Sequence, residues 1–365
     1  MRPISDTIQR LAKMQAGGMA HGTPDRLREL GPFQPNPGNL RGRLYVPDTI
    51  APGAALVVAL HGCTQTAAAY DHGTGWSTLA DREGFVVLFP EQQRANNANL
   101  CFNWFEPADI ARSGGEAESI AAMIDAVLAL HPIDPTRVFV TGLSAGGAMS
   151  AVMLATWPDK LAGGAIIGGL PYGGATGVPQ ALDRMRGHGA PTDAAATAAV
   201  RAAAAGVPGA PRVSVWHGSA DTTVVVGNLD RLVGQWRGVH DLTAGPDAVA
   251  KGANWEHRSW NGPDGTALVE EWRVAGMGHG VPIDPSSGIG AAGPFMLDVG
   301  LSSTEAIAQS WGLTGTPAAS ATTVATPAPA PRVRRLEPVV EERQPVAGGV
   351  QATIERALRA AGLMR

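Results

Sequence analysis

The sequence predicts an α/β fold, with a mostly parallel twisted sheet of about eight strands and helices on both faces. The first observation is that short apolar runs alternate with longer amphipathic segments from residue 40 to residue 313. This alternation is typical of parallel strands joined by crossover helices. The second observation is a hydrophobic content of 44% in 365 residues, which is enough for a sizeable core. The length allows one large α/β domain with appendages, or two domains.

The predicted elements follow one another along the chain in a regular order. Apolar, β-branched and aromatic runs predict strands at residues 42–46, 56–60, 85–89, 138–141, 165–167, 213–216, 255–260 and 268–274. Apolar residues at helical spacing predict helices at residues 76–82, 116–130, 146–156, 228–236 and 304–310. A Pro-Asp-Gly turn at residues 263–265 joins the last two strands, which we expect to form a hairpin. Alanine-rich residues 181–206 predict a helical insertion, either a lid or a plain surface helix.

Changes in composition divide the chain into four parts. An N-terminal extension, the α/β domain, a Pro/Ala-rich linker and a short amphipathic C-terminal helix are expected at residues 1–39, 40–313, 314–349 and 350–365. In the last part, Val350, Ile354 and Leu358 fall on one helical face. We expect this helix to dock back, to self-associate or to touch a hydrophobic particle, or else to be a loosely attached tail.

Charge and targeting signals narrow the range of partners. A net charge of −4 makes no electrostatic case for nucleic acid. No stretch approaches the roughly 18 uninterrupted apolar residues of a membrane span. Residues 1–10 include a basic residue without an apolar segment behind it, so we expect no secretory signal and a cytoplasmic protein. The histidines lack paired ligand spacing, and we expect neither a metal nor another cofactor.

Residues 142–147, Gly-Leu-Ser-Ala-Gly-Gly, carry the most informative signal in the chain. They lie between a predicted strand and a predicted helix, which is the context that gives the G-x-S-x-G pattern a catalytic meaning. Glycines allow a tight turn there, so Ser144 is expected at the sheet edge beside the positive end of a helix. Because the chain holds 47 glycines, chance alone would supply this pattern roughly 0.25 times, and the remaining residues must decide.

A serine nucleophile needs a base and an acid, which in α/β hydrolases follow it in the order Asp or Glu, then His. His279 lies in a glycine-rich loop after the last predicted strand, and Asp221 follows the sixth. Catalytic groups gather at the C-terminal ends of parallel strands, so we predict a triad of Ser144, Asp221 and His279. His217 is the alternative base, although we expect it to pack or to shape the loop beside the acid.

An oxyanion hole requires two backbone N–H donors. One is expected at Ala145, directly after the nucleophile. The other is expected in the loop that begins at His61, where we favour Cys63 over Gly62. Such donors contribute on the order of 3–4 kcal/mol each in the transition state. Cys63 and Cys101 follow neighbouring predicted strands, and the residues alone leave open one disulfide or two free thiols.

Six short segments, taken together and in order, carry a family resemblance. They are HGCTQ, PEQ, CFNWF, GLSAGGAM, WHGSAD and GMGHG, which begin at residues 61, 90, 101, 142, 216 and 276. From about Leu40 to Leu313 the chain resembles the polyhydroxybutyrate (PHB) depolymerase family of esterases. The resemblance implies an α/β-hydrolase fold and the triad named above. It also implies an oxyanion hole at Cys63 and Ala145, and a Cys63–Cys101 disulfide.

The same resemblance implies a cofactor-independent serine esterase acting on poly(3-hydroxybutyrate) or hydroxyalkanoate oligomers, or on short-chain esters, through an acyl-enzyme. Related members act as acetyl xylan or feruloyl esterases, which makes carbohydrate esters the alternative. A serine peptidase and a non-catalytic binding protein on the same fold are more distant alternatives. Trp104, with Asn103 and Gln65, is expected to shape the acyl or alcohol pocket, unless Trp104 belongs to the core. Many members are secreted, so an extracellular location is the alternative to the cytoplasm.

Overall fold

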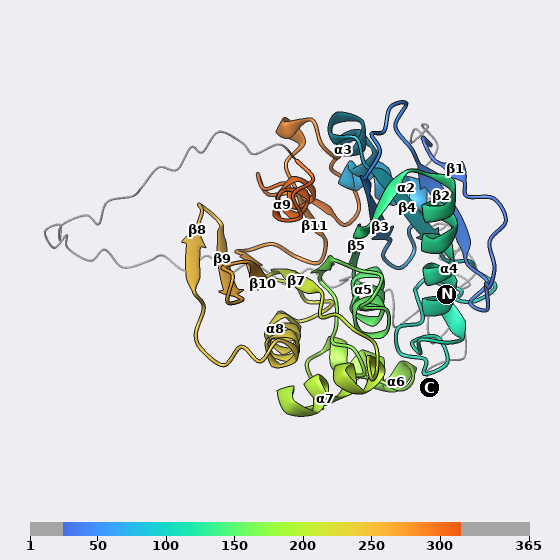
Figure 1. Ribbon diagram of the computed structural model, residues 1–365. Coiled ribbons are helices and arrows are strands. Elements are labelled where there is room, and N and C mark those ends of the chain that lie inside the picture. The colour runs from blue at the N-terminus through green and yellow to red at the C-terminus, as the bar shows by residue number, and fades with distance from the viewer. Residues whose placement is uncertain (1–24, 315–365) are drawn as a thin grey trace, which may run out of the picture.

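A ten-stranded sheet runs through the molecule and separates two groups of helices (Figure 1). The structure is a computed structural model, which describes residues 25–314. Strands follow the spatial order β1-β2-β4-β3-β5-β6-β7-β10-β9-β8. In chain order they are β1 (Arg28–Glu29), β2 (Arg41–Tyr45), β3 (Ala54–Leu60), β4 (Val86–Glu91), β5 (Ile133–Leu143), β6 (Gly163–Ile167), β7 (Arg212–Gly218), β8 (Ala248–Lys251), β9 (Trp255–Asn261) and β10 (Ala267–Val274). A separate two-stranded sheet consists of β11 (Val281–Ile283) and β12 (Met296–Asp298).

The centre of the sheet is parallel and its edges are antiparallel. Strands β4, β3, β5, β6, β7 and β10 pair in parallel, whereas β1 and β2 at one edge and β9 and β8 at the other pair antiparallel. Every residue of β3, with the sequence AALVVAL, is buried, as expected for a strand covered on both faces. The C-terminal ends of the six parallel strands therefore meet at one edge, where loops can bring polar groups together.

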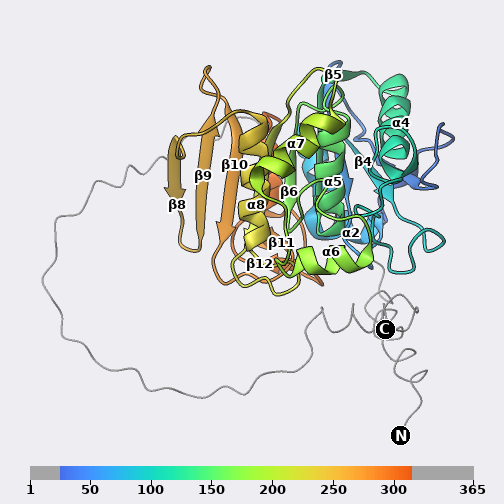
Figure 2. The ribbon, with the colours of Figure 1, turned by 90° about the horizontal axis from the view of Figure 1, so that it is seen from below.

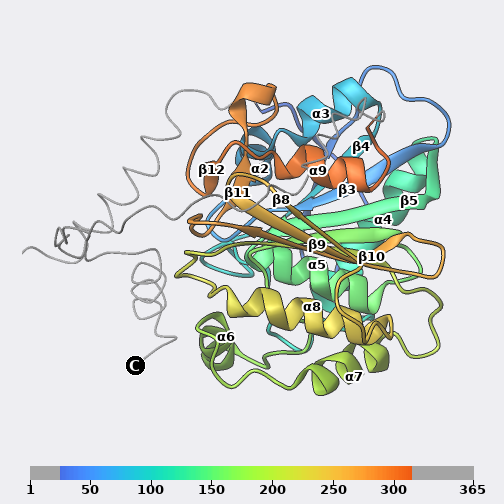
Figure 3. The same ribbon diagram turned by 90° about the vertical axis from the view of Figure 1, so that its left-hand side faces the viewer.

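Two layers of helices cover the faces of the sheet, as Figure 3 shows edge-on. One layer holds α4, α5, α6, α7 and α8, and the other holds α2, α3 and α9. In the described residues the helices are α2 (Ala67–Thr74), α3 (Trp76–Glu83), α4 (Gly115–Leu130), α5 (Ala145–Thr156), α6 (Val178–Met185), α7 (Asp193–Ala203), α8 (Gly227–Val239) and α9 (Ser303–Ser310). All residues of α5 are buried, so this helix forms the centre of its layer.

Each predicted strand and helix overlaps an element of the structure, and the expected α/β architecture is confirmed. The last two predicted strands form the antiparallel hairpin β9–β10 (Figure 2). The alanine-rich insertion folds as α6 and α7. The sheet has two strands more than the expected eight, namely the edge strands β1 and β8. They were not predicted, because they are short and exposed and their sequences show no alternation of apolar and polar residues. The linker after Thr314 and the predicted helix at residues 350–365 lie outside the described residues.

Between residues 25 and 314, no helix combines the length and the apolar character needed to cross a bilayer.

Stacked aromatic rings hold the end of the described chain against the sheet. Trp311, directly after α9, stacks on Phe139 of β5 with ring centroids 4.7 Å apart and an interplanar angle of 10°. It also stacks on Trp76 of α3, at 6.0 Å and 15°. Trp311 is 5% exposed, so α9 is fixed to both the sheet and a neighbouring helix.

We expect Trp311→Ala to lower the free energy of unfolding by about 3–5 kcal/mol, because it leaves a cavity between two rings. Urea unfolding followed by circular dichroism measures this change. Leu130→Ala is the control, since Leu130 is 64% exposed, and its effect should stay within about 0.5 kcal/mol. Similar losses in the two variants would contradict the anchoring role of Trp311.

Candidate active site

Ser144 lies in the sharp turn between β5 and α5. Its φ of 58° and ψ of −116° are unusual for a residue other than glycine. The turn is possible because Gly146 has no side chain. A Cβ there would lie only 2.2 Å from the Leu60 carbonyl oxygen and would push α5 away from β3. Ser144 is only half-buried, whereas both its neighbours are buried. The strained turn therefore presents the serine at the edge of the sheet.

His279 and Asp221 form a hydrogen-bonded pair. The His279 Nδ1 atom lies 2.7 Å from Asp221 Oδ2. An ionised carboxylate only accepts hydrogen bonds, so Nδ1 carries the proton and Nε2 is left as a base. The two residues follow β7 and β10, which pair in parallel with Gly218 opposite Val274.

The end of β6 lies between the serine and the histidine. The Ser144 N–H donates to the Ile167 carbonyl oxygen at 2.9 Å. A Cβ on Gly168, the next residue, would lie 3.3 Å from Cε1 of His279. The segment at the end of β6 therefore contacts Ser144 on one side and the Asp221–His279 pair on the other, as its place between β5 and β7 in the sheet requires.

Four polar hydrogens surround the Asp221 carboxylate. Its Oδ1 accepts the N–H groups of Thr223 and Val224 at 2.8 and 2.9 Å. Its Oδ2 faces His279 Nδ1 and, at 3.3 Å, His217 Nε2. Burial raises the pKa of Asp221, but the hydrogen bonds of His217 and His279 outweigh this effect and hold that pKa well below its usual range. Asp221 is therefore ionised at neutral pH.

His217 is fully buried beside the acid. Its Nε2 lies 2.7 Å from the Val224 carbonyl oxygen, which can only accept, so Nε2 carries the proton. The other ring nitrogen, Nδ1, is buried and has no partner in the described part of the chain. His217 thus donates to the loop of Asp221, which fits the expected loop-shaping role better than that of a base.

The backbone N–H groups expected to bind an oxyanion differ in whether they already have a partner. The Gly62 N–H is occupied, because it donates to Gln65 Oε1 at 2.8 Å. The next N–H, that of Cys63, has no acceptor within residues 25–314. Ala145 is the first residue of α5, and an N–H at this position has no partner in its own helix. The hydrogen bonding therefore favours Cys63 over Gly62 as the second donor.

A disulfide and a buried histidine fix the loop of Cys63. Cys63 and Cys101 are bonded, as the family resemblance implies. The Gln92 N–H donates to His61 Nε2 at 3.1 Å, so the other ring nitrogen of His61 carries the proton and donates to the Gly62 carbonyl oxygen at 2.8 Å. The first residues after β3 are thus tied to the end of β4 and to the loop of Cys101.

The residues expected near the substrate differ in their surroundings. Trp104 is 7% exposed and belongs to the core, yet it also lines a small cavity with Leu170 and Pro171. Asn103 Oδ1 accepts a hydrogen bond from the Asn97 amide at 3.0 Å. The Gln65 side chain binds the backbone of its own loop. The two amides therefore support loops, and Trp104 joins the core to a cavity.

Glu116 was not predicted from the sequence. It lies at the start of α4, fully buried, and its carboxyl group accepts hydrogen bonds from the Gln92 side chain and from the Asn103 N–H. Burial, with a smaller effect of Asp109, raises the pKa of Glu116 to about 8. A glutamate in the first turn of a helix is common, so nothing in the sequence distinguishes this one as buried.

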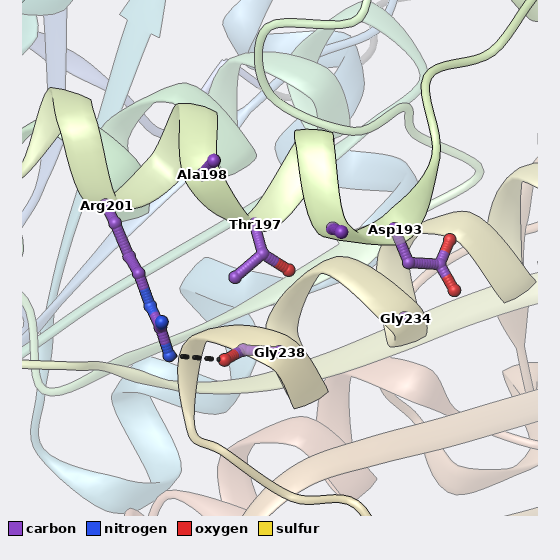
Figure 4. A pocket seen from close by; sticks show the side chains of 7 residues that line it. Asp193, Thr197, Ala198, Arg201, Gly234 and Gly238 are labelled. Carbon is purple, nitrogen blue, oxygen red and sulfur yellow. Dashed lines mark hydrogen bonds between the residues drawn. The ribbon is translucent and has the colours of Figure 1, made fainter.

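A second hollow lies between α7 and α8 (Figure 4). Arg201 donates to the Gly238 carbonyl oxygen at 2.8 Å, and Thr197 donates to Gln235 at 3.2 Å. A Cβ on Gly238 would lie 2.1 Å from Thr197 Oγ1. The glycine thus allows the two helices to pack closely, and neither the Ser144 turn nor the Asp221–His279 pair lines this hollow.

Comparison with known proteins identifies the family. Residues 40–257 match the family model described as esterase PHB depolymerase. The chain belongs to this family. This PHB depolymerase-family protein is a carboxylic ester hydrolase with an α/β-hydrolase fold.

The relatives of this esterase include bacterial and fungal proteins. It is 45% identical over 293 residues to poly(3-hydroxyalkanoate) depolymerase C of Paucimonas lemoignei. The aligned region covers 79% of this chain and 70% of that protein. It is 32% identical to a probable acetylxylan esterase A of Aspergillus clavatus, over 71% of this chain and 85% of that protein. The solved structure of an acetyl xylan esterase from Aspergillus awamori superposes with a TM-score of 0.68 at 26% identity, covering 79% of this chain and 99% of that one.

If the Cys63 N–H binds the oxyanion, as predicted, we expect the esterase to lose at least about ten-fold in kcat when the Cys63–Cys101 bond is reduced, because the loop of Cys63 is no longer held in place. Initial rates on a p-nitrophenyl ester, with thiol titration, measure the loss. The control is the Cys63→Ala, Cys101→Ala double variant, which should start at the lower rate and not respond to reductant. Full kcat in the reduced enzyme would disprove a role for the bond.

The buried Glu116 carboxyl should make stability depend on pH. From its usual pKa of 4.5 up to about 8, the folded chain holds a proton that the unfolded chain has released. This group therefore lowers the free energy of unfolding as pH rises through that window, by at most about 1.4 kcal/mol per pH unit. We expect Glu116→Gln to flatten the pH dependence of urea unfolding.

Glu118→Gln is the matched control, since it also removes a carboxylate from the first turn of α4. The control should keep the slope of the parent enzyme. Equal slopes in all three proteins would show that Glu116 does not hold its proton in the folded state.

Proposed function

We propose that Ser144, His279 and Asp221 are the catalytic triad, with Cys63 and Ala145 as the oxyanion donors. The observation that carries this proposal is the 2.7 Å contact between His279 Nδ1 and Asp221 Oδ2, beside the strained turn of Ser144. Because His279 is held in one tautomer, its Nε2 lone pair is available to accept the serine proton.

The first half of the reaction transfers the acyl group to the enzyme. Ser144 Oγ attacks the ester carbonyl carbon while His279 Nε2 takes the hydroxyl proton. Negative charge develops on the carbonyl oxygen, where the N–H groups of Cys63 and Ala145 bind it. The C–O bond to the alcohol then breaks, and His279 returns the proton to the departing oxygen. Asp221 stabilises the imidazolium present between these steps.

The second half releases the acid. Water takes the place of the alcohol and gives a proton to His279 as its oxygen attacks the acyl carbon. The second tetrahedral intermediate uses the same donors. Its collapse breaks the bond to Ser144 Oγ, which recovers the proton from His279. No residue changes its net charge over the whole cycle.

We assign 3-hydroxyalkanoate esters as the substrate class, either polymer or oligomers. The support is the 45% identity to a poly(3-hydroxyalkanoate) depolymerase over 79% of the chain. The alternative is an acetylated or feruloylated carbohydrate, supported by relatives near 30% identity that include acetylxylan esterases and a feruloyl esterase B of Talaromyces stipitatus. Both classes use the same chemistry at Ser144 and differ in the alcohol and acyl groups.

The triad is tested with a fluorophosphonate probe and two variants. Ser144→Ala should abolish labelling and turnover, and Asp221→Asn should lower kcat by about 10⁴-fold while leaving the fold intact. Labelling that survives Ser144→Ala would sink the proposal.

The substrate class is tested with 3-hydroxybutyrate oligomers, acetylated xylo-oligosaccharides, methyl ferulate and an amide analogue. We expect the highest kcat/KM on the hydroxybutyrate oligomers. A higher value on either carbohydrate-type ester would favour the alternative, and amide cleavage would indicate a peptidase.

A further inference from the structure

Phe295 occupies a backbone position that favours glycine. Residues 293–296, Gly-Pro-Phe-Met, form a turn closed by a 3.0 Å hydrogen bond from the Met296 N–H to the Gly293 carbonyl oxygen. Phe295 is third in this turn and has a φ of 64°. Because proline in second position cannot adopt a positive φ, this is a type II turn, whose third position normally holds glycine or asparagine. A bulky aromatic residue there is strained.

The turn is fixed against the loop of His279. The Phe295 carbonyl oxygen accepts the Val281 N–H at 2.8 Å. A Cβ on Gly280 would lie 2.6 Å from the same oxygen, so only glycine allows this close approach. Gly280 directly follows His279, and the turn therefore sets where the Phe295 ring stands relative to that histidine.

The Phe295 ring stands beside the proposed catalytic base. Its centroid lies 6.2 Å from that of the His279 ring, with the rings nearly perpendicular at 80°. The residue is half-buried, and its side chain packs in part against the hydrophobic core beneath α2, α3 and α9. Strained residues persist where the surroundings hold them, and they cluster at functional sites.

The Phe295 ring lies near the place where the alcohol part of an ester would bind. His279 gives its proton to the departing alcohol, so the alcohol must lie next to its imidazole. The carbonyl oxygen of the ester points instead to the proposed donors at Cys63 and Ala145. An apolar ring next to the imidazole gains from an alkyl-bearing alcohol, whereas a sugar alcohol would lose hydration there without a polar partner.

We propose that Phe295 is a specificity-determining residue that contacts the leaving alcohol and favours a 3-hydroxyalkanoate unit over a sugar. This inference rests on the proposed function, because it needs His279 as the proton donor. It accounts for a phenylalanine at a turn position that favours glycine. It also places recognition of the polyester on the alcohol side, apart from the acyl pocket.

The test uses two esters with the same acyl group. Methyl 3-hydroxybutyrate releases methanol as its alcohol, whereas cleavage of the inner ester of the 3-hydroxybutyrate dimer methyl ester releases methyl 3-hydroxybutyrate, and chromatography distinguishes the two alcohols. Phe295→Asn removes the ring and keeps a residue that tolerates positive φ. We expect its kcat/KM to fall about ten-fold on the dimer and less than about two-fold on methyl 3-hydroxybutyrate. Phe295→Leu should recover most of the loss.

Phe295→Gly is the second variant, and it relieves the backbone strain while removing the ring. It should show the same change in substrate preference, with circular dichroism and fluorophosphonate labelling like those of the parent enzyme. An equal fall on both esters in the Asn and Gly variants, or no fall on either, would overturn the inference while leaving the triad intact. Failure of the unmodified chain to hydrolyse either ester or to react with the probe would overturn the proposed function, and this inference with it.

Discussion

The close approach of α5 to the ends of β3 and β6 is the constraint on which the site depends. Without side chains on Gly146 and Gly147, the first turn of the helix comes within van der Waals distance of the backbone at Leu60 and Ile167. That contact forces the turn at Ser144 into its unusual backbone conformation. It also brings the N-terminal amides of α5 beside the loop after β3, which holds the second proposed oxyanion donor, Cys63.

The rest of the site is held by bonds that do not touch a substrate. Asp221 is fixed by backbone amides of its own loop and by His217, and the loop of Cys63 is fixed by a disulfide and by His61. Dipoles that are already oriented need not reorganise when charge develops in the transition state. The Glu116 carboxyl group has an opposite effect on the free energy of unfolding, because burying it is unfavourable. Its hydrogen bond from the Asn103 N–H orders the loop before Trp104.

Most of the architecture could be predicted because the central parallel strands are buried on both faces. Such burial requires a continuous run of apolar residues, which can be recognised in the sequence. The triad of Ser144, Asp221 and His279 was predicted for a related reason, since each residue follows a predicted strand, and of this prediction the structure shows the Asp221–His279 hydrogen bond and the sharp turn at Ser144. The edge strands β1 and β8 escape this reasoning, because exposed segments pair through their backbones and carry no pattern.

The roles of Glu116 and Phe295 escape it for another reason, since they depend on contacts between segments distant in sequence. Glu116 is buried by the loops of Gln92 and Asn103. Phe295 lies beside His279 only because its turn contacts the loop of His279 in the folded chain. A glutamate in a first helical turn and a phenylalanine after a proline are both ordinary in a sequence, and only the folded arrangement makes them unusual.

The parallel pairing of β7 with β10 brings together two residues that are far apart in the sequence. Asp221 and His279 are 58 positions apart, yet each leaves its strand at the same level of the sheet, with Gly218 opposite Val274. Helix α8 and strands β8 and β9 lie between these strands in the chain, whereas the Asp221 carboxylate is held by amides of the loop that directly follows β7. Changes in length or sequence confined to α8, β8 and β9 would therefore alter the outer surface of the enzyme and leave the contact between Asp221 and His279 in place.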